Sequence, residues 1–286
     1  MPRSSRLLWA GLALAVVVLI PAIWAMLQPG GPRGVLVRWF GPPQVELSEA
    51  YAARDDVADF DHAVLNELLR EFVDDGGYVD YEGLRERRVD LQGYIRSLAA
   101  AHFDGLGRDE KLALLINAYN AFTLELILEH APLQSIRDIP AEQRWEAVRW
   151  NVAGREYSLN QIEHEQIRPK FREPRIHFAL VCAAVSCPPL RREAYTGARL
   201  NDQLEDQALR VHHGEGWLRY ESGAETIGLT SLYEWYRDDF EQVAGTILDY
   251  VARYREDLDG GDRPTVRFLE YDWSLNDQRR REGPAG

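Results

Sequence analysis

The chain has 286 residues, a formal net charge of −13 and a pI near 5.1. This acidic balance argues against a nucleic-acid partner, because affinity for a phosphate backbone rests largely on clustered lysine and arginine. The same charge keeps the body of the protein off an anionic lipid surface. Two cysteines, Cys182 and Cys187, are too few for a disulfide framework, so the fold must depend on its hydrophobic core.

An apolar segment without charged residues runs from residue 7 to residue 27. A bilayer core needs about 20 apolar residues in a helix, so this segment predicts one transmembrane helix, in which Pro21 is tolerated. A cleaved signal peptide fits less well, because its apolar region has about 7 to 15 residues before a small-residue site, whereas residues 23–25 read Ile-Trp-Ala. We expect residues 1–6 on the cytoplasmic side of the inner or plasma membrane and the globular domain on the opposite side, with this helix as the membrane contact.

Residues 28–45 are rich in glycine and proline and predict a linker. Residues 46–276 contain no second linker and are long enough for one sizeable core, so we expect a single globular domain there. A polar, disordered tail is expected at residues 277–286.

Apolar residues recur at helical spacing over residues 59–73 and, most regularly, over residues 108–129. Between these two helices, residues 78–81 predict a short strand. Residues 145–152 and 155–159 alternate in polarity and predict a hairpin. The motif from Ser158 to Gln161 is a capping box, whose side chains satisfy unpaired backbone N–H groups, and it predicts a short helix to about residue 168.

Residues 175–184 form a nearly continuous apolar run, which predicts a strand buried on both faces at the centre of the sheet. Residues 200–212 predict a helix, and residues 217–229 predict two strands. A second capping box, from Ser231 to Glu234, opens a helix, and a further helix to about residue 254 and a strand at 266–271 complete the domain. The predicted class is α+β: one globular domain with a mixed, largely antiparallel sheet packed by helices and preceded by one transmembrane helix.

Both cysteines lie in the segment His177-Phe-Ala-Leu-Val-Cys182-Ala-Ala-Val-Ser-Cys187-Pro-Pro. On a strand, residues five apart lie about 16 Å apart and on opposite faces, so His177 and Cys182 are not expected to pair. A disulfide needs Cα atoms within about 7 Å and therefore a sharp turn within residues 183–186. At such a turn Cys187 is the candidate nucleophile, while Cys182 fits a small buried residue. A structural role for Cys187, bridged or buried, is the open alternative.

Glu163 and His164 lie on the short capped helix that precedes this segment. His164 is a candidate general base oriented by Glu163, as thiol chemistry requires, and the alternative is a histidine that caps or salt-bridges the helix. His164, His177 and the two cysteines also supply four zinc-type ligands. Strand geometry separates His177 from Cys182, so neither a metal nor another cofactor is predicted.

The sequence Asn117-Ala-Tyr119-Asn120 lies inside the strongest predicted helix, where asparagine has poor propensity and must find hydrogen bonds if buried. The two asparagines are three positions apart and share one face. They either tie the helix to neighbouring backbone or belong to a site. In the second case Asn117 orients a catalytic histidine, while Asn120, Tyr119, His177 and Ser186 bind substrate.

Four motifs follow one another along the chain: LINAYNAF at 115–122, SLNQIEH at 158–164, RIHFALVCAAVSCPPL at 175–190 and YDWSLN at 271–276. Together they resemble domain of unknown function 547 (DUF547), a family of bacterial, often membrane-anchored proteins and of plant proteins with a leucine-zipper segment. Glu173 departs from the aspartate expected there. The family has no assigned activity. The resemblance implies shared positions at Asn117, Tyr119, Asn120, Glu163, His164, His177, Cys182, Ser186, Cys187 and Pro188.

Two functions of different kinds fit these observations. The first is an extracytoplasmic thiol enzyme, a hydrolase or acyl transferase, with Cys187 as nucleophile and His164 as base. The second is a non-catalytic binding or scaffolding domain with a structural cysteine loop and an exposed apolar patch for a protein or peptide partner. The first predicts a free thiol near His164, and the second predicts a disulfide or buried thiols.

Overall fold

The computed structural model describes residues 42–51, 59–258 and 263–280. The chain divides into two compact units, Met1–Pro43 and Gln44–Gly286, and the fold below is that of the second unit. The predicted transmembrane helix at 7–27 and most of the predicted linker lie outside the described residues.

The helix predicted at residues 108–129 is present as α6 (Arg108–His130), and it is buried along almost its whole length. Among the described residues it is also the one helix that is long and apolar enough to cross a membrane by length and composition. Because 94% of its most apolar window is buried inside the protein, α6 has the environment of a core helix.

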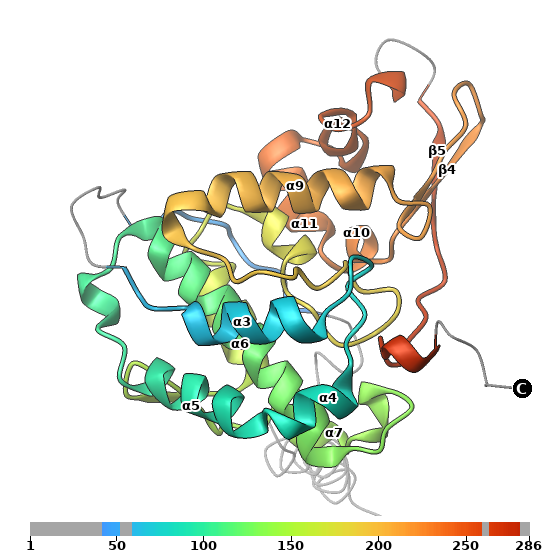
Figure 1. Ribbon diagram of the computed structural model, residues 1–286. Helices are drawn as coiled ribbons and strands as arrows, with labels where there is room; N and C mark the ends of the chain where they lie inside the picture. Colours follow the sequence, from blue (N-terminus) through green and yellow to red (C-terminus); the bar gives the residue numbers. More distant parts are fainter. Residues whose placement is uncertain (1–41, 52–58, 259–262, 281–286) are drawn as a thin grey trace, which may run out of the picture. The chain divides into compact units, whose positions relative to one another are not determined.

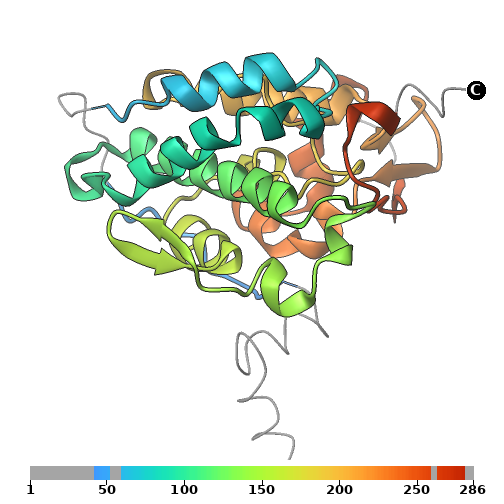
Figure 2. The ribbon, with the colours of Figure 1, turned by 60° about the horizontal axis from the view of Figure 1, so that its bottom comes forward.

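The first hydrophobic core forms where α3 (Ala63–Phe72), α4 (Tyr81–Glu86) and α5 (Arg88–Ala99) pack with α6. Leu65, Leu68, Leu69 and Phe72 follow helical spacing and bury one face of α3. Helix α5 contacts both α3 and α6, and in Figure 2 these three helices follow one another in layers. The hairpin of β1 (Trp150–Val152) and β2 (Arg155–Tyr157) packs against α5.

The predicted capping box at Ser158 is confirmed. The Ser158 hydroxyl accepts the Gln161 N–H, and the Gln161 side chain accepts the Ser158 N–H. The box opens α8 (Leu159–Gln161), which continues as the π-helical turn η3 (Ile162–Ile167). Both elements contact α6, and π-helical turns are frequent at functional sites.

A second hydrophobic core lies between α9 (Leu200–His213), α10 (Leu232–Trp235), α11 (Arg237–Ala244), α12 (Ile247–Ala252) and a small sheet. Strand β4 (Thr226–Leu229) pairs antiparallel with β3 (Leu218–Arg219) and parallel with β5 (Thr265–Phe268). Figure 1 shows these elements in yellow-orange to red, gathered around α9. The fold class is α+β, as predicted, with small antiparallel and mixed sheets.

The central strand predicted at residues 175–184 is wrong. Residues Pro174–Phe178 form the 3-10 helix η4, which begins with Pro174 and is capped by the Glu173 side chain, and an irregular loop follows it. This apolar run is buried by helices, η4 packing against α9 and α11. Hydrophobicity alone does not distinguish a buried helix from a buried strand over so short a run.

Two smaller predictions also fail. In the segment at 78–81, Val79 forms isolated bridges to Val73 and Asp277, while Tyr81 already begins α4. Ser231 does not cap α10, because its hydroxyl donates to the Leu269 carbonyl at 2.7 Å instead. In both cases a segment distant in the sequence supplies a partner, Asp277 for Val79 and Leu269 for Ser231.

The ordered fold includes residues beyond the predicted domain end at 276. Asp277 is buried, the backbone of Asn276 accepts the Val79 N–H, and η7 (Gln278–Arg280) follows. The remaining residues of the predicted tail, 281–286, lie outside the described part of the chain.

Gly77 and Gly154 provide a matched test of how closely the turn that contains Gly77 packs on the segment after the cysteines. Both have a positive φ, +81° and +79°, but a Cβ on Gly77 would lie 2.5 Å from Pro189 Cα, whereas nothing lies within 4 Å at Gly154. We expect Gly154→Ala to cost about 1 kcal/mol of unfolding free energy, and Gly77→Ala to cost roughly 1–3 kcal/mol more. Urea unfolding of both variants measures the difference, and equal costs would contradict the close approach.

Candidate functional site

The two cysteines close a short loop, called here the cysteine loop (residues 182–187). Cys182 and Cys187 form a disulfide, with their Cα atoms 6.3 Å apart. The chain turns sharply between them because Ala183 adopts a positive φ of 59° and the Cys187 N–H donates to the Ala184 carbonyl at 3.1 Å. In this form neither sulfur is a thiol.

A segment almost 90 residues later in the chain, 271–276, holds the cysteine loop from outside. Val185 N–H donates to the Ser274 carbonyl at 2.8 Å, and Asn276 N–H donates to the Ala183 carbonyl at 3.1 Å. The side chain of Ser186 accepts the Asp272 N–H at 2.8 Å. Ser186 therefore stabilises the loop and does not stand free as a substrate ligand.

Two side chains from other elements complete the support of the loop. The Trp217 indole N–H lies 3.1 Å from the carbonyl oxygens of both Ser186 and Cys187. The Tyr271 hydroxyl lies 3.2 Å from each of the two sulfur atoms. Tyr271 thus covers the disulfide, and burial raises the pKa of its hydroxyl above the ordinary value.

The side-chain amides of Asn117 and Asn120 each bond to one backbone carbonyl and one backbone N–H, as the edge of a neighbouring strand would. The Asn120 amide donates to the Ala179 carbonyl and accepts the Val181 N–H, both at 2.9 Å. The Asn117 amide makes the same pair of bonds with the backbone of Tyr195, at 2.7 and 2.9 Å. These buried amides tie α6 to the chain on either side of the cysteine loop, which matches the first of the two roles considered for them.

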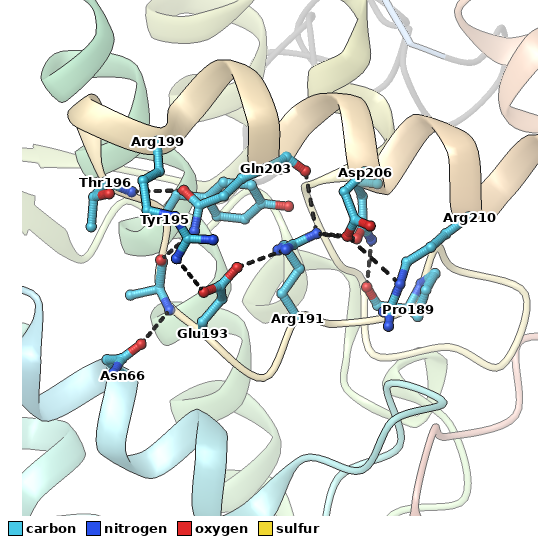
Figure 3. A network of polar contacts seen from close by, with 12 residues as sticks. Asn66, Pro189, Arg191, Glu193, Tyr195, Thr196, Arg199, Gln203, Asp206 and Arg210 are labelled. Carbon is cyan, nitrogen blue, oxygen red and sulfur yellow. Dashed lines mark hydrogen bonds and ion pairs between the residues drawn. The ribbon is translucent and has the colours of Figure 1, made fainter. Parts of the chain in front are cut away.

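The segment after the cysteine loop is fastened to α9 by the polar network of Figure 3. Arg191 donates to Glu193 at 2.6 Å, and Arg199 donates to the same carboxylate at 2.8 Å. Burial opposes ionisation of Glu193, but the hydrogen bonds from both arginines lower its pKa to about 2. Gln203 on α9 binds the Ala194 carbonyl at 2.9 Å. Both flanks of the loop are therefore rigid.

A buried charged cluster lies at the end of η3 and on η4 and α11. Arg168 donates two hydrogen bonds of 2.7 Å to the Asp239 carboxylate, and His177 Nε2 donates to the same carboxylate at 2.8 Å. Arg168 and Asp239 are each about 1% exposed. Although burial disfavours its charge, these bonds hold the pKa of Asp239 well below its usual range. His177 is therefore hydrogen-bonded to Asp239, and its ring stacks on the Tyr236 ring with the ring centroids 3.8 Å apart.

The charged cluster determines the state of His164. Arg168 lies 3.1 Å from His164 Nδ1 and is always a donor, so Nδ1 accepts and the ring proton is on Nε2. Burial lowers the pKa of His164 to about 4, and the Arg168 charge adds to this effect while Glu163 opposes it. His164 is neutral at pH 7 and is a weak base, which does not suit the role predicted for it.

Glu163 lies 3.8 Å from His164 Nδ1 and is itself buried. The hydroxyls of Tyr119 and Tyr236 are hydrogen-bonded to it, and burial, followed by the Glu163 charge, raises the pKa of both tyrosines well above 10. The same charge acts on Tyr271. Glu163 and Tyr119 thus lie near Tyr271, whose hydroxyl contacts both sulfur atoms of the disulfide.

The structure divides the predicted site residues among three tasks. Glu163, His164 and Tyr119 meet beside the charged cluster, the two asparagines and Ser186 bind backbone groups, and Cys182 and Cys187 form the disulfide. Sequence reasoning missed Arg168, Asp239, Tyr236 and Tyr271. The spacing of four residues between His164 and Arg168 on one helix was a usable signal, and nothing local pointed to Asp239. In the described part of the chain, no three His, Cys, Asp or Glu side chains group as metal ligands.

These features define an α+β domain built around a disulfide-closed loop and a buried charged cluster. Residues 103–210, from η1 (Phe103–Gly105) into α9, match the model of the family described as "Protein of unknown function, DUF547". The resemblance to DUF547 is confirmed over these residues. No curated protein and no solved structure matches the chain.

Two buried histidines should make the folded protein less stable at acidic pH. Burial lowers the pKa of both His164 and His212 to about 4, below the unfolded value of 6.5, so the unfolded chain binds protons more readily in that interval. The free energy of unfolding should therefore fall as the pH drops from about 6.5 to 4, by roughly 3 kcal/mol for each histidine.

His164→Gln keeps an acceptor for Arg168 and removes one of the two titrations, so it should reduce this pH dependence by about half, while His213→Gln, at an exposed position, should leave it unchanged. Urea unfolding at a series of pH values gives the slopes. A slope in His164→Gln equal to that of the parent would contradict the neutral, buried state of His164.

Proposed function

We propose that the chain is a non-catalytic binding domain with a structural cysteine loop, held outside the inner or plasma membrane by the apolar segment at residues 7–27. The observation that carries this proposal is the disulfide between Cys182 and Cys187. Disulfides persist in oxidising compartments, which supports a location outside the cytoplasm. A bridged Cys187 is not available as a nucleophile, and a neutral His164 tied to Arg168 is poorly suited to activate one.

The binding surface in this proposal is an aromatic cluster of four half-buried rings beside the cysteine loop: Trp145, Trp235, Tyr271 and Trp273. Trp273 lies 4.6 Å from Tyr271 and 5.8 Å from Trp235, measured between ring centroids. Arg137 lies over Trp273 and Arg144 over Trp145, at 5.4 and 4.8 Å. Tryptophan, tyrosine and arginine are the side chains that contribute most energy at protein interfaces.

The rigid support beneath this aromatic cluster favours binding of a protein or peptide. Tyr271 is fixed by its contacts with both sulfur atoms, and the neighbouring backbone at 272–276 pairs with the cysteine loop. A preformed surface loses little side-chain entropy when it binds, so the energy of ring contacts is retained as affinity. In this scheme the disulfide contributes to binding by holding the aromatic cluster in place.

The state of the cysteines separates a structural loop from a thiol enzyme. In full-length protein from an oxidising compartment, we expect neither cysteine to react with an alkylating agent until a reductant is added, as intact mass would show. The double variant Cys182→Ser/Cys187→Ser should fold with its unfolding free energy reduced by about 2 kcal/mol, the value for closing so short a loop. Rapid labelling of Cys187 alone at neutral pH, slowed by His164→Ala, would instead support the hydrolase or acyl transferase.

The aromatic cluster can be tested with peptides selected on the full-length protein by phage display. Affinity for the best peptides should fall about tenfold or more in Trp273→Ala, which removes a ring at the centre of the cluster. Tyr220→Ala removes an aromatic side chain from the second core and should leave the affinity unchanged. Peptides that bind both variants with the parent affinity would place recognition elsewhere.

A further inference from the structure

A cavity of about 540 Å³ lies between the β1–β2 hairpin, the segment 101–105 and the end of η3, on elements other than those of the aromatic cluster. Its lining includes Tyr51, Tyr157, Gln166, Arg155 and Lys170. The volume is in the range of small-molecule sites, and polar groups make up much of the wall. Neither the family match nor the proposed binding function assigns a role to this cavity.

Two cations face this cavity from different elements. Arg155 stands on β2, and Lys170 follows η3. Lys170 donates to Gln166 Oε1 at 2.6 Å, and within the described chain neither cation forms an ion pair with a carboxylate. Many other arginines of this acidic protein are ion-paired, including Arg149 with Glu129 at 2.6 Å on the same hairpin edge. Two like charges kept close together without an ion pair are a feature of anion sites.

The electrostatics of the cavity agree with its geometry. Burial lowers the pKa of the Lys170 ammonium, and repulsion from Arg155 adds to this effect, while the nearby Glu165 partly offsets both. The acidic side chain in the lining is Asp104, which with burial raises the pKa of the Tyr51 hydroxyl. The Tyr51 hydroxyl is therefore protonated at neutral pH, and the hydroxyls of Tyr51 and Tyr157 can donate hydrogen bonds.

We propose that this cavity binds a small organic oxyanion, a carboxylate or a phosphate ester, with Lys170 and Arg155 on the anionic group and the two tyrosines against its body. An oxyanion there satisfies both cations at once. Charge-assisted hydrogen bonds to such a group are about twice as strong as neutral ones. The ligand also relieves the repulsion between Lys170 and Arg155, so it raises the pKa of the ammonium and lowers the reactivity of the amine.

The lysine content of the chain makes this site easy to follow. The sequence contains two lysines, Lys111 and Lys170. Lys111 is buried and bonded to the Leu106 carbonyl, so an amine-selective reagent should reach Lys170 far faster. The rate of Lys170 acylation, read from peptide masses, therefore reports occupancy of the cavity without any assay of activity.

The test uses full-length protein with phenyl phosphate, succinate and inorganic phosphate as probes, at constant ionic strength set with sodium chloride. We expect phenyl phosphate or succinate to slow acylation of Lys170 in a saturable manner, and the more effective probe identifies the anion class. Protection by inorganic phosphate alone would mean that the cavity takes the free ion, and would overturn the organic ligand. Equal rates with chloride and with every probe would overturn the site altogether.

Calorimetric titration of the more effective probe then assigns the two cations. Arg155→Gln and Lys170→Gln should each weaken binding about tenfold, whereas Lys170→Arg should retain most of the affinity. Arg149→Gln changes an arginine of the same hairpin that is ion-paired outside the cavity, and it should bind like the parent. Thermal unfolding verifies that each variant is folded. Unchanged affinity in both folded glutamine variants would overturn the assignment.

Discussion

A loop that leaves water has to find a hydrogen-bond partner for each of its peptide groups, and this requirement dominates the chain around the two cysteines. Residues 179–187 are largely buried but form neither a helix nor a strand, so few of their peptide groups are paired within the segment. The Asn120 amide, the Trp217 indole and the backbone of 272–276 supply those partners from three distant parts of the sequence. The disulfide then closes a loop whose shape these contacts already define.

A second constraint is the cost of burying charge, which is tolerable where the charges are paired. The Asp239 carboxylate meets this condition by accepting two hydrogen bonds from Arg168 and one from His177. Burial keeps His164 neutral, and the charge of Arg168, which also donates to that histidine, adds to this effect. A residue with the sequence signature of a general base therefore stabilises the packing of η3 instead, and the chemistry of the region follows from electrostatics more than from residue type.

The aromatic cluster and the cavity lie on different parts of the domain. The aromatic cluster is fixed beside the cysteine loop through Tyr271, whereas the cavity with Lys170 and Arg155 lies at the hairpin and the far end of η3. Their chemistry differs as well, since one presents apolar rings and the other presents two cations. The proposed protein-binding surface and the proposed small-molecule site therefore share no residue.

The sequence by itself determined the elements that depend on local interactions. Helix α6, the β1–β2 hairpin and the Ser158 capping box were predictable because periodicity, turn residues and caps act within a few positions. The four motifs also contain residues that lie at the cysteine loop, among them Ser186 and Tyr271. Only the tertiary structure decided that residues 174–178 are helical, that Ser231 bonds to Leu269, and that Asp239 controls His177 and, through Arg168, His164. These outcomes depend on partners up to 71 residues away, and no local pattern encodes such contacts.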